Sequence, residues 1–357
     1  NIVIPKQAQE NFSTIEKTLY EYVETLATSP NDRISPIPLS LKNYLDAHQT
    51  HLATIRQYLM QVDTLNWGNP YDVTTIDIGT PIPGFLSISR FSAILMLDSL
   101  DHHLQGQDKI ALMNLQNLSK VSQSLKKRPT TISHFVALHI ERELAGLIRK
   151  LDDLPKNWQN QVSLLAPSDQ ERLFQSFRVE LAVIANTLIA FNWEESGVLL
   201  VIDSEPIYNF FGYFQKPYYR LVALDILQTQ NRSLEQLKTQ DFCTFNSDEY
   251  ANHPDLQPAW WNFFYDIWFT YQWLGFARFK LEWELTEKVQ KIKTVARQQG
   301  QFPDEIAGIE QSMCDESRWV YEVNDQGKAS IHLDGIPPAI RERDARSEDE
   351  VPLAYNF

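Results

Sequence analysis

Residues 85–125 read FLSISRFSAILMLDSLDHHLQGQDKIALMNLQNLSKVSQSL, and the fold class follows from them. The stretch contains two runs with helical spacing of apolar residues, 85–104 and 109–125, separated by Gln105, Gly106 and Gln107. Glycine often ends a helix, because it adopts the left-handed conformation that closes the last turn. The stretch therefore predicts two antiparallel helices joined by a tight connection.

The same texture extends over most of the chain, with short proline-rich punctuation between the runs. Further helices are predicted over residues 13–26, 40–62, 131–151, 168–191, 217–237 and 275–299. Pro217 suits the first position of a helix, where its missing N–H has no partner to lose. The pattern predicts a mainly α protein, built as a multi-helix bundle or an array of helical hairpins.

The C-terminal part has a different texture. Residues 318–322 and 328–333 are β-prone, and the polar stretch from Asn324 to Gly327 between them suits a hairpin turn. We therefore expect a small antiparallel β-ribbon, followed by an extended, charged surface tail. The predicted organisation is a helical domain over 1–310, the ribbon over 311–340 and the tail over 341–357. A second possible division lies within the helical domain, near 195–215.

Composition limits the classes of partner. The chain has 357 residues, of which 43% are hydrophobic, enough for one large core or two smaller ones. A net charge of −14 argues against nucleic acid, whose phosphates are normally met by a basic face. The densest basic stretch, from Lys126 to Arg128, is interpreted as a solvated helix C-terminus favoured by the helix dipole.

Two features of the sequence bear on the cellular location of the protein, namely its first residue and its two cysteines. The first residue is Asn1, so a signal peptide or a membrane anchor preceding it is one option, and membrane association would run through that anchor. No apolar run of 18 or more residues is present to span a membrane. Cys243 and Cys314 can be read either as a disulfide or as two thiols.

Several segments resemble a family of bacterial exported or membrane-anchored helical proteins of unassigned activity. Residues 90–104, 106–125 and 129–136 are similar to its paired helices, and residues 216–225 to its proline-initiated helix. Residues 295–309 resemble a stretch that the family shares with pseudopilin C-terminal regions. The resemblance covers roughly residues 40–335 and departs from the family at residues 260–276. It implies a helical fold and an extracytoplasmic location, and nothing about chemistry.

Residues 260–276 are the most unusual part of the sequence, because ten of these seventeen residues are Trp, Phe or Tyr. As a helix, the segment would carry aromatic groups on every face. One interpretation is a central core helix; the other is a surface that binds a protein or an apolar ligand. The candidate binding residues are Trp260, Trp261, Phe264, Trp268, Tyr271 and Trp273.

Motifs for catalysis are missing from the sequence. It has no phosphate-binding loop, nucleophile elbow or dinucleotide fingerprint, so no cofactor and no catalytic residue is assigned. Asp98 and His102, four residues apart on a helix, are weak candidates for a metal site, although histidines at a helix end more often cap it. We expect a non-catalytic binding or scaffolding protein outside the cytoplasm. The alternative is a hydrolase with a carboxylate and histidine site near the loop over 66–84.

Overall fold

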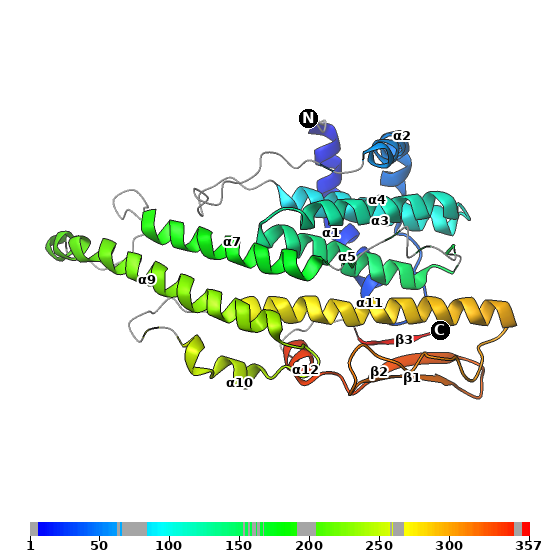
Figure 1. Cartoon of the computed structure of the whole chain (residues 1–357). Coiled ribbons are helices and arrows are strands. Elements are labelled where there is room, and N and C mark those ends of the chain that lie inside the picture. The colour runs from blue at the N-terminus through cyan, green and yellow to red at the C-terminus, as the bar shows by residue number, and fades with distance from the viewer. Residues whose placement is uncertain are drawn as a thin grey trace.

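The computed structural model is mainly helical and ends in a small antiparallel sheet, which confirms the predicted fold class (Figure 1). It describes residues 6–62, 65, 84–152, 154–155, 158, 162, 165–166, 168–190, 205–257, 259, 268–345 and 352–357. The helices are α1 (Lys6–Thr28), α2 (Leu39–Gln61), α3 (Phe85–Leu104), α4 (Asp108–Lys126), α5 (Thr131–Lys150), α7 (Asp169–Ala190), α9 (Glu205–Thr239), α10 (Ser247–Ala251), α11 (Trp268–Gln299) and α12 (Pro338–Asp344), with a short 3-10 turn at Pro254–Leu256. The strands are β1 (Arg318–Val323), β2 (Ala329–Asp334) and β3 (Ala354–Asn356).

The predicted hairpin is present as α3 and α4. Gly106 lies in the connection with a φ of 73°, the left-handed conformation that glycine adopts without strain. Together with α1, α2 and α5, the hairpin forms the first core, in which Leu19, Leu45, Leu95, Leu115 and Leu144 are completely buried. These helices make up the upper layer in Figure 1.

Helices α1 and α5 cross at very short range within this core. A Cβ atom built on Gly146 would lie 2.3 Å from the carbonyl oxygen of Ala27, closer than any real contact. The crossing therefore requires glycine at position 146.

The second core lies between α7, α9, α11, α12 and the sheet. Phe177, Leu234, Leu285, Trp319 and Tyr355 are among its fully buried members. Helix α11 contributes to both cores, since Phe279 and Trp283 belong to the first. Figure 1 shows α11 as the long helix between the upper layer and the sheet.

Helix α11 is longer than the sequence predicted. Two helices were expected, over 260–276 and 275–299, whereas one helix runs from Trp268 to Gln299 with Gly275 inside it. A Cβ at Gly275 would lie 3.4 Å from the guanidinium of Arg343, so this glycine gives room to a neighbouring side chain and ends no helix. Pro217 likewise lies inside α9 and is exposed, whereas the sequence had predicted that it begins a helix.

The sheet has the strand order β1-β2-β3, and both pairings are antiparallel. Trp319 pairs with Leu333, and Ile331 pairs with Tyr355. These four side chains are buried in the second core, so the register places one face of the sheet against the helices.

The C-terminal region differs from the predicted extended tail over 341–357. Residues through Asp344 belong to α12, and 354–356 form β3. Leu353 and Tyr355 are buried, and the Tyr355 hydroxyl donates hydrogen bonds to Asp32 (2.6 Å) and to the carbonyl of Arg149 (3.0 Å). The prediction was wrong because the run of charges over residues 341–350 indicated an extended tail, and the strand that follows it is only three residues long.

Lys126 also differs from the prediction. It was expected to be solvated, but its side chain is only 4% exposed. Its ammonium group lies 2.7 Å from Glu141 of α5 and 2.5 Å from Asp169 at the start of α7. The fold brings two carboxylates from distant parts of the sequence to the end of α4, and they satisfy the charge that water was expected to solvate.

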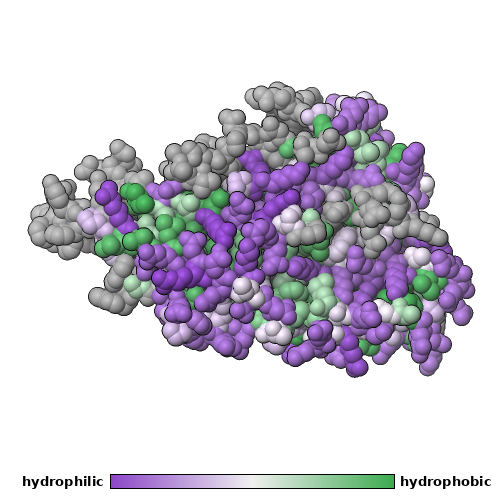
Figure 2. All heavy atoms as spheres, viewed as in Figure 1, coloured by the Kyte–Doolittle hydropathy of each residue, from purple (hydrophilic) through white to green (hydrophobic). Residues whose placement is uncertain are grey.

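The face of the molecule in Figure 2 is largely hydrophilic, and apolar groups gather over α7 and α9. Among the side chains of these two helices that the structure describes, the exposed large apolar residues are Ile184, Ile189, Leu221 and Leu224. No helix in the described ranges is long and apolar enough to cross a membrane. Residues 66–83 of the predicted loop and residues 195–204 of the predicted sub-boundary lie outside the described residues, and residues 205–215 belong to α9.

Candidate functional site

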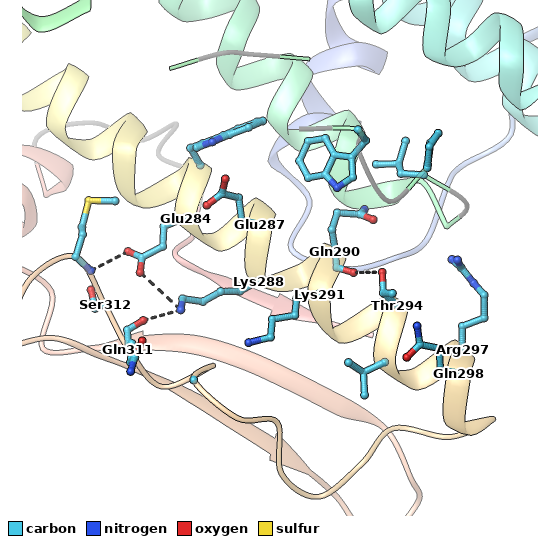
Figure 3. Close-up of a pocket in the computed structure, with 17 residues that line it drawn as sticks. Glu284, Glu287, Lys288, Gln290, Lys291, Thr294, Arg297, Gln298, Gln311 and Ser312 are labelled. Carbon is cyan, nitrogen blue, oxygen red and sulfur yellow. Dashed lines mark hydrogen bonds and ion pairs between the residues drawn. The ribbon is translucent and has the colours of Figure 1, made fainter. Parts of the chain in front are cut away.

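A groove runs along one face of α11 and has a volume of about 970 Å³ (Figure 3). One wall is the segment from Gly308 to Met313, which precedes β1. Leu154, Pro155 and Trp158, which follow α5, line it as well. Ligand pockets typically enclose about 300–1,000 Å³, so the groove has room for a small molecule or a segment of polypeptide.

The helix presents a regular row of side chains to the groove. Glu284, Lys288, Lys291, Val295 and Gln298 are spaced by four, three, four and three residues. With 3.6 residues per turn, this spacing keeps all five on one face. The opposite face of α11 is buried in the second core, which fixes the position of the helix and therefore of this row of side chains.

Two lysines of the row hold the wall in place. The Lys288 ammonium donates a hydrogen bond of 2.5 Å to the carbonyl of Gln311, and the Lys291 ammonium donates one of 2.6 Å to the carbonyl of Ala307. Hydrogen bonds from a charged donor are stronger than neutral ones. The wall is therefore bound to the helix through its main chain, independent of its own side chains.

Glu284 adds a third attachment. Its carboxylate accepts a hydrogen bond of 3.3 Å from the backbone N–H of Met313 and lies 3.6 Å from the Lys288 ammonium (Figure 3). Burial lowers the pKa of Lys288, and the neighbouring charge of Glu284 opposes that shift. The charge of Glu284 thus favours the charged form of Lys288.

A disulfide between Cys243 and Cys314 ties the end of the wall to the turn between α9 and α10. The sequence had left the state of these cysteines open. Since Cys314 directly follows Met313, the crosslink adds a covalent restraint at the end of the wall. The groove is therefore preformed, which reduces the entropy lost when a ligand binds.

The remaining part of the groove is aromatic. Trp158 and Trp283 pack edge to face, with ring centroids 5.6 Å apart and an interplanar angle of 65°. Both side chains are largely buried, so only small parts of their rings reach the groove. Tryptophan edges beside polar side chains offer a ligand both apolar contact and hydrogen bonding.

The groove suits recognition better than proton transfer. It contains the acids Glu284 and Glu287 and the bases Lys288, Lys291 and Arg297, so neither sign dominates. Both lysines already donate to main-chain carbonyls. Within the described ranges, no group of three or more His, Cys, Asp or Glu side chains could hold a metal ion.

Three of the six aromatic candidates, Trp260, Trp261 and Phe264, lie outside the described residues. Trp268 begins α11, and its side chain is likewise outside the described part. For these four residues, a binding role stays a prediction.

The other two aromatic candidates lie in contrasting environments. Trp273 is 2% exposed and packs edge to face on Phe245 in the second core, with ring centroids 5.0 Å apart. Tyr271 is 46% exposed, and the Arg343 guanidinium lies 4.9 Å from the centre of its ring. In the described end of the aromatic run, Phe269 and Phe276 are buried with Trp273 in the second core, whereas Tyr271 lies at the surface.

Asp98 and His102 lie close together in a buried polar cluster. Asp98 forms an ion pair with Arg56, accepts a hydrogen bond of 2.7 Å from Asn114 and lies 3.5 Å from the His102 imidazole. His102 also contacts the side chain of Gln107 at 2.6 Å. The carboxylate is thus already bonded to a cation and an amide, which leaves it a structural role between α2, α3 and α4.

No family model, curated protein or solved structure matches the chain. The resemblance to exported helical proteins therefore stays a prediction. The same holds for the hydrolase alternative, because residues 66–83 lie outside the described part. Sequence reasoning missed the groove, although the spacing of Glu284, Lys288 and Lys291 was visible as a polar row on a predicted helix. Its wall could not be foreseen, because it depends on long-range contacts.

Proposed function

We propose that the protein is a non-catalytic binding or scaffolding protein that acts outside the cytoplasm, and that the α11 groove holds a segment of a partner protein. The observation that carries this proposal is the preformed groove, whose wall is attached to α11 by three hydrogen bonds and restrained by a disulfide.

The lining supports a polypeptide ligand. Protein interfaces are enriched in tryptophan and arginine, with hydrogen-bonding groups at the rim. The groove combines the edges of Trp158 and Trp283 with Arg297, Gln298 and Thr294. An extended main chain offers both donors and acceptors to such side chains along its whole length.

The disulfide supports the location. Disulfides form and persist in oxidising compartments and are rare in the cytosol, where thiols are kept reduced. A crosslink between Cys243 and Cys314 therefore agrees with the extracytoplasmic location that the family resemblance implies.

Two adjacent glutamines provide a matched test. Gln298 lines the groove and Gln299 does not, while both are exposed near the end of α11. We expect Gln298→Trp to fill the groove and to lose a partner that wild type and Gln299→Trp both retain in pull-downs from membranes and soluble extract. Equal circular dichroism spectra and unfolding temperatures would show that both variants are folded. Retention of every partner by Gln298→Trp would refute a role for the groove.

A further inference from the structure

The two edges of the sheet differ in whether another segment of the chain pairs with them. Beyond β3, the segment around Asn31 covers the edge: the Asn356 N–H donates to the carbonyl of Pro30 at 2.8 Å, and the Asp32 N–H donates to the carbonyl of Asn356 at 3.2 Å. On the other side, β1 is the outermost strand of the sheet (Figure 1).

The pairing of the hairpin shows which residues of β1 face outward. The Asn324 N–H donates to the carbonyl of Lys328 at 2.9 Å, directly beyond the last paired residues of β1 and β2. Because hydrogen bonding alternates along an antiparallel strand, the backbone groups of Arg318, Val320 and Glu322 point toward β2. Those of Trp319, Tyr321 and Val323 point away from the sheet.

The first of these outward positions has a backbone partner. The Trp319 N–H donates to the carbonyl of Glu310 at 3.0 Å. The backbone groups of Tyr321 and Val323 form no outward hydrogen bond with any part of the chain that the structure describes. An open strand edge of this kind is a template for pairing with another chain, and natural proteins usually cover or blunt it.

A second groove, of about 550 Å³, lies beside this edge. It is bounded by β1 on one side and by residues 304–310 on the other. The hydroxyl of Tyr321 donates a hydrogen bond of 2.9 Å to the carbonyl of Pro303, which holds the start of this segment near the strand. The groove therefore has space beside the open backbone groups.

The charge of this second groove is negative. Asp304, Glu305 and Glu310 line it and are exposed, whereas Arg318 is its single base and lies 3.3 Å from Asp334. Charge complementarity favours a ligand with positive side chains and speeds its association.

We propose that the outer edge of β1 binds an extended, basic segment of a partner protein, which pairs with Tyr321 and Val323 and adds a strand to the sheet. Recognition by strand addition takes its affinity from main-chain hydrogen bonds and its specificity from side chains. Lysine or arginine side chains of the added strand would lie beside Asp304 and Glu305. This surface is distinct from the α11 groove, since residues 304–313 separate the two.

Three synthetic eight-residue peptides with blocked ends test the proposal. The first alternates lysine and valine, the second alternates lysine and proline, and the third alternates glutamate and valine. The second has the same charge as the first, but its proline residues have no N–H and disfavour strand pairing. Fluorescence anisotropy should show that the first peptide binds at least tenfold more tightly than either of the others. Equal binding of the two lysine peptides, or no binding of the first, would overturn the proposal.

Variants of the protein locate the site. Val323→Pro removes the outward backbone N–H at position 323. Val323→Ala is the control, because it shortens the side chain but keeps this N–H. We expect the proline variant to lose at least tenfold in affinity for the lysine–valine peptide and the alanine variant to change less than threefold. Asp304→Lys with Glu305→Lys should reverse the preference toward the glutamate–valine peptide. Unchanged binding by this charge reversal contradicts the proposal even if Val323→Pro fails to fold.

Gln298→Trp separates this proposal from the function proposed above. It fills the α11 groove and should leave binding of the lysine–valine peptide unchanged. Loss of partners in pull-downs together with normal peptide binding would support both sites independently. Loss of peptide binding in folded Gln298→Trp would contradict the location at β1.

Discussion

Arg142 of α5 donates two hydrogen bonds to Glu282 of α11, of 3.1 Å from Nε and 2.9 Å from Nη2. Glu282 is almost completely buried and also lies 3.2 Å from the guanidinium of Arg278. One carboxylate therefore joins a helix of the first core to the helix that both cores share.

Replacement of Glu282 by alanine should be strongly destabilising. It would leave Arg278 buried without this partner, and breaking a buried ion pair by removing one member costs about 3–5 kcal/mol. Glu235→Ala is the control, because Glu235 and its partner Arg178 are largely exposed and such pairs contribute about 0–1 kcal/mol. Urea unfolding of both variants measures the difference. Similar losses for the two would show that the link between the cores is unimportant for stability.

Two glycines inside helices make a second matched pair. Gly146→Ala would place a methyl group 2.3 Å from the main chain of Ala27, and we expect a loss of about 1–3 kcal/mol or more, since the helices must move apart. Gly275→Ala meets only the flexible end of Arg343, so the better helix propensity of alanine should leave stability equal or raise it by up to about 1 kcal/mol. Thermal unfolding of both variants tests the contrast, and an unchanged Gly146→Ala would show that the crossing has room to adjust.

The disulfide should contribute measurably to stability. It closes a loop of 71 residues in sequence, and disulfides of small domains typically contribute about 2–4 kcal/mol. A variant with Cys243→Ser and Cys314→Ser should unfold at a lower temperature than wild type. Reductant should lower the unfolding temperature of wild type toward that of the variant and have no effect on the variant itself. A wild type that is indifferent to reductant would argue against the crosslink.

Glu143 should make stability depend on pH. Burial raises its pKa to about 8, and the charge of Glu24 adds to the shift. The folded state thus holds a proton that the unfolded state releases near pH 4.5, so this group's contribution falls as pH rises from about 4.5 to 8. Glu143→Gln should therefore gain stability relative to wild type over this range, on the order of a few kcal/mol at pH 8 and little at pH 4.5. Denaturant titrations of the two proteins at pH 4.5, 6.5 and 8 measure this difference, and a constant difference would contradict it.

The helical hairpin and the β-ribbon could be predicted, because each is formed by residues that are close together in the sequence. The hairpin at 85–125 followed from its apolar spacing and from Gly106, and the β-ribbon from the turn between Asn324 and Gly327. The strand at 354–356 was not predicted, because it is short and its pairing partner, β2, is specified by no pattern in the neighbouring sequence.

The candidate groove was harder to predict for the same reason. Lys288 and Lys291 were visible as polar residues on a helix, but their acceptors are main-chain carbonyls of a loop, which carry no sequence signal. Lys126 was misjudged because Glu141 and Asp169 lie 15 and 43 residues further along the chain. Long-range electrostatic contacts of this kind come from tertiary structure.

The contact of Tyr355 with Asp32 spans 323 residues. During synthesis, the segment at 30–32 leaves the ribosome long before β3 exists, so the sheet edge that it covers cannot form until residues 354–356 have emerged. Helices α1 to α5 all precede residue 151, whereas the second core, to which α11 contributes, includes side chains of the C-terminal sheet. Until residues 353–355 are synthesised, the second core therefore lacks Leu353 and Tyr355, so it cannot close completely in the nascent protein.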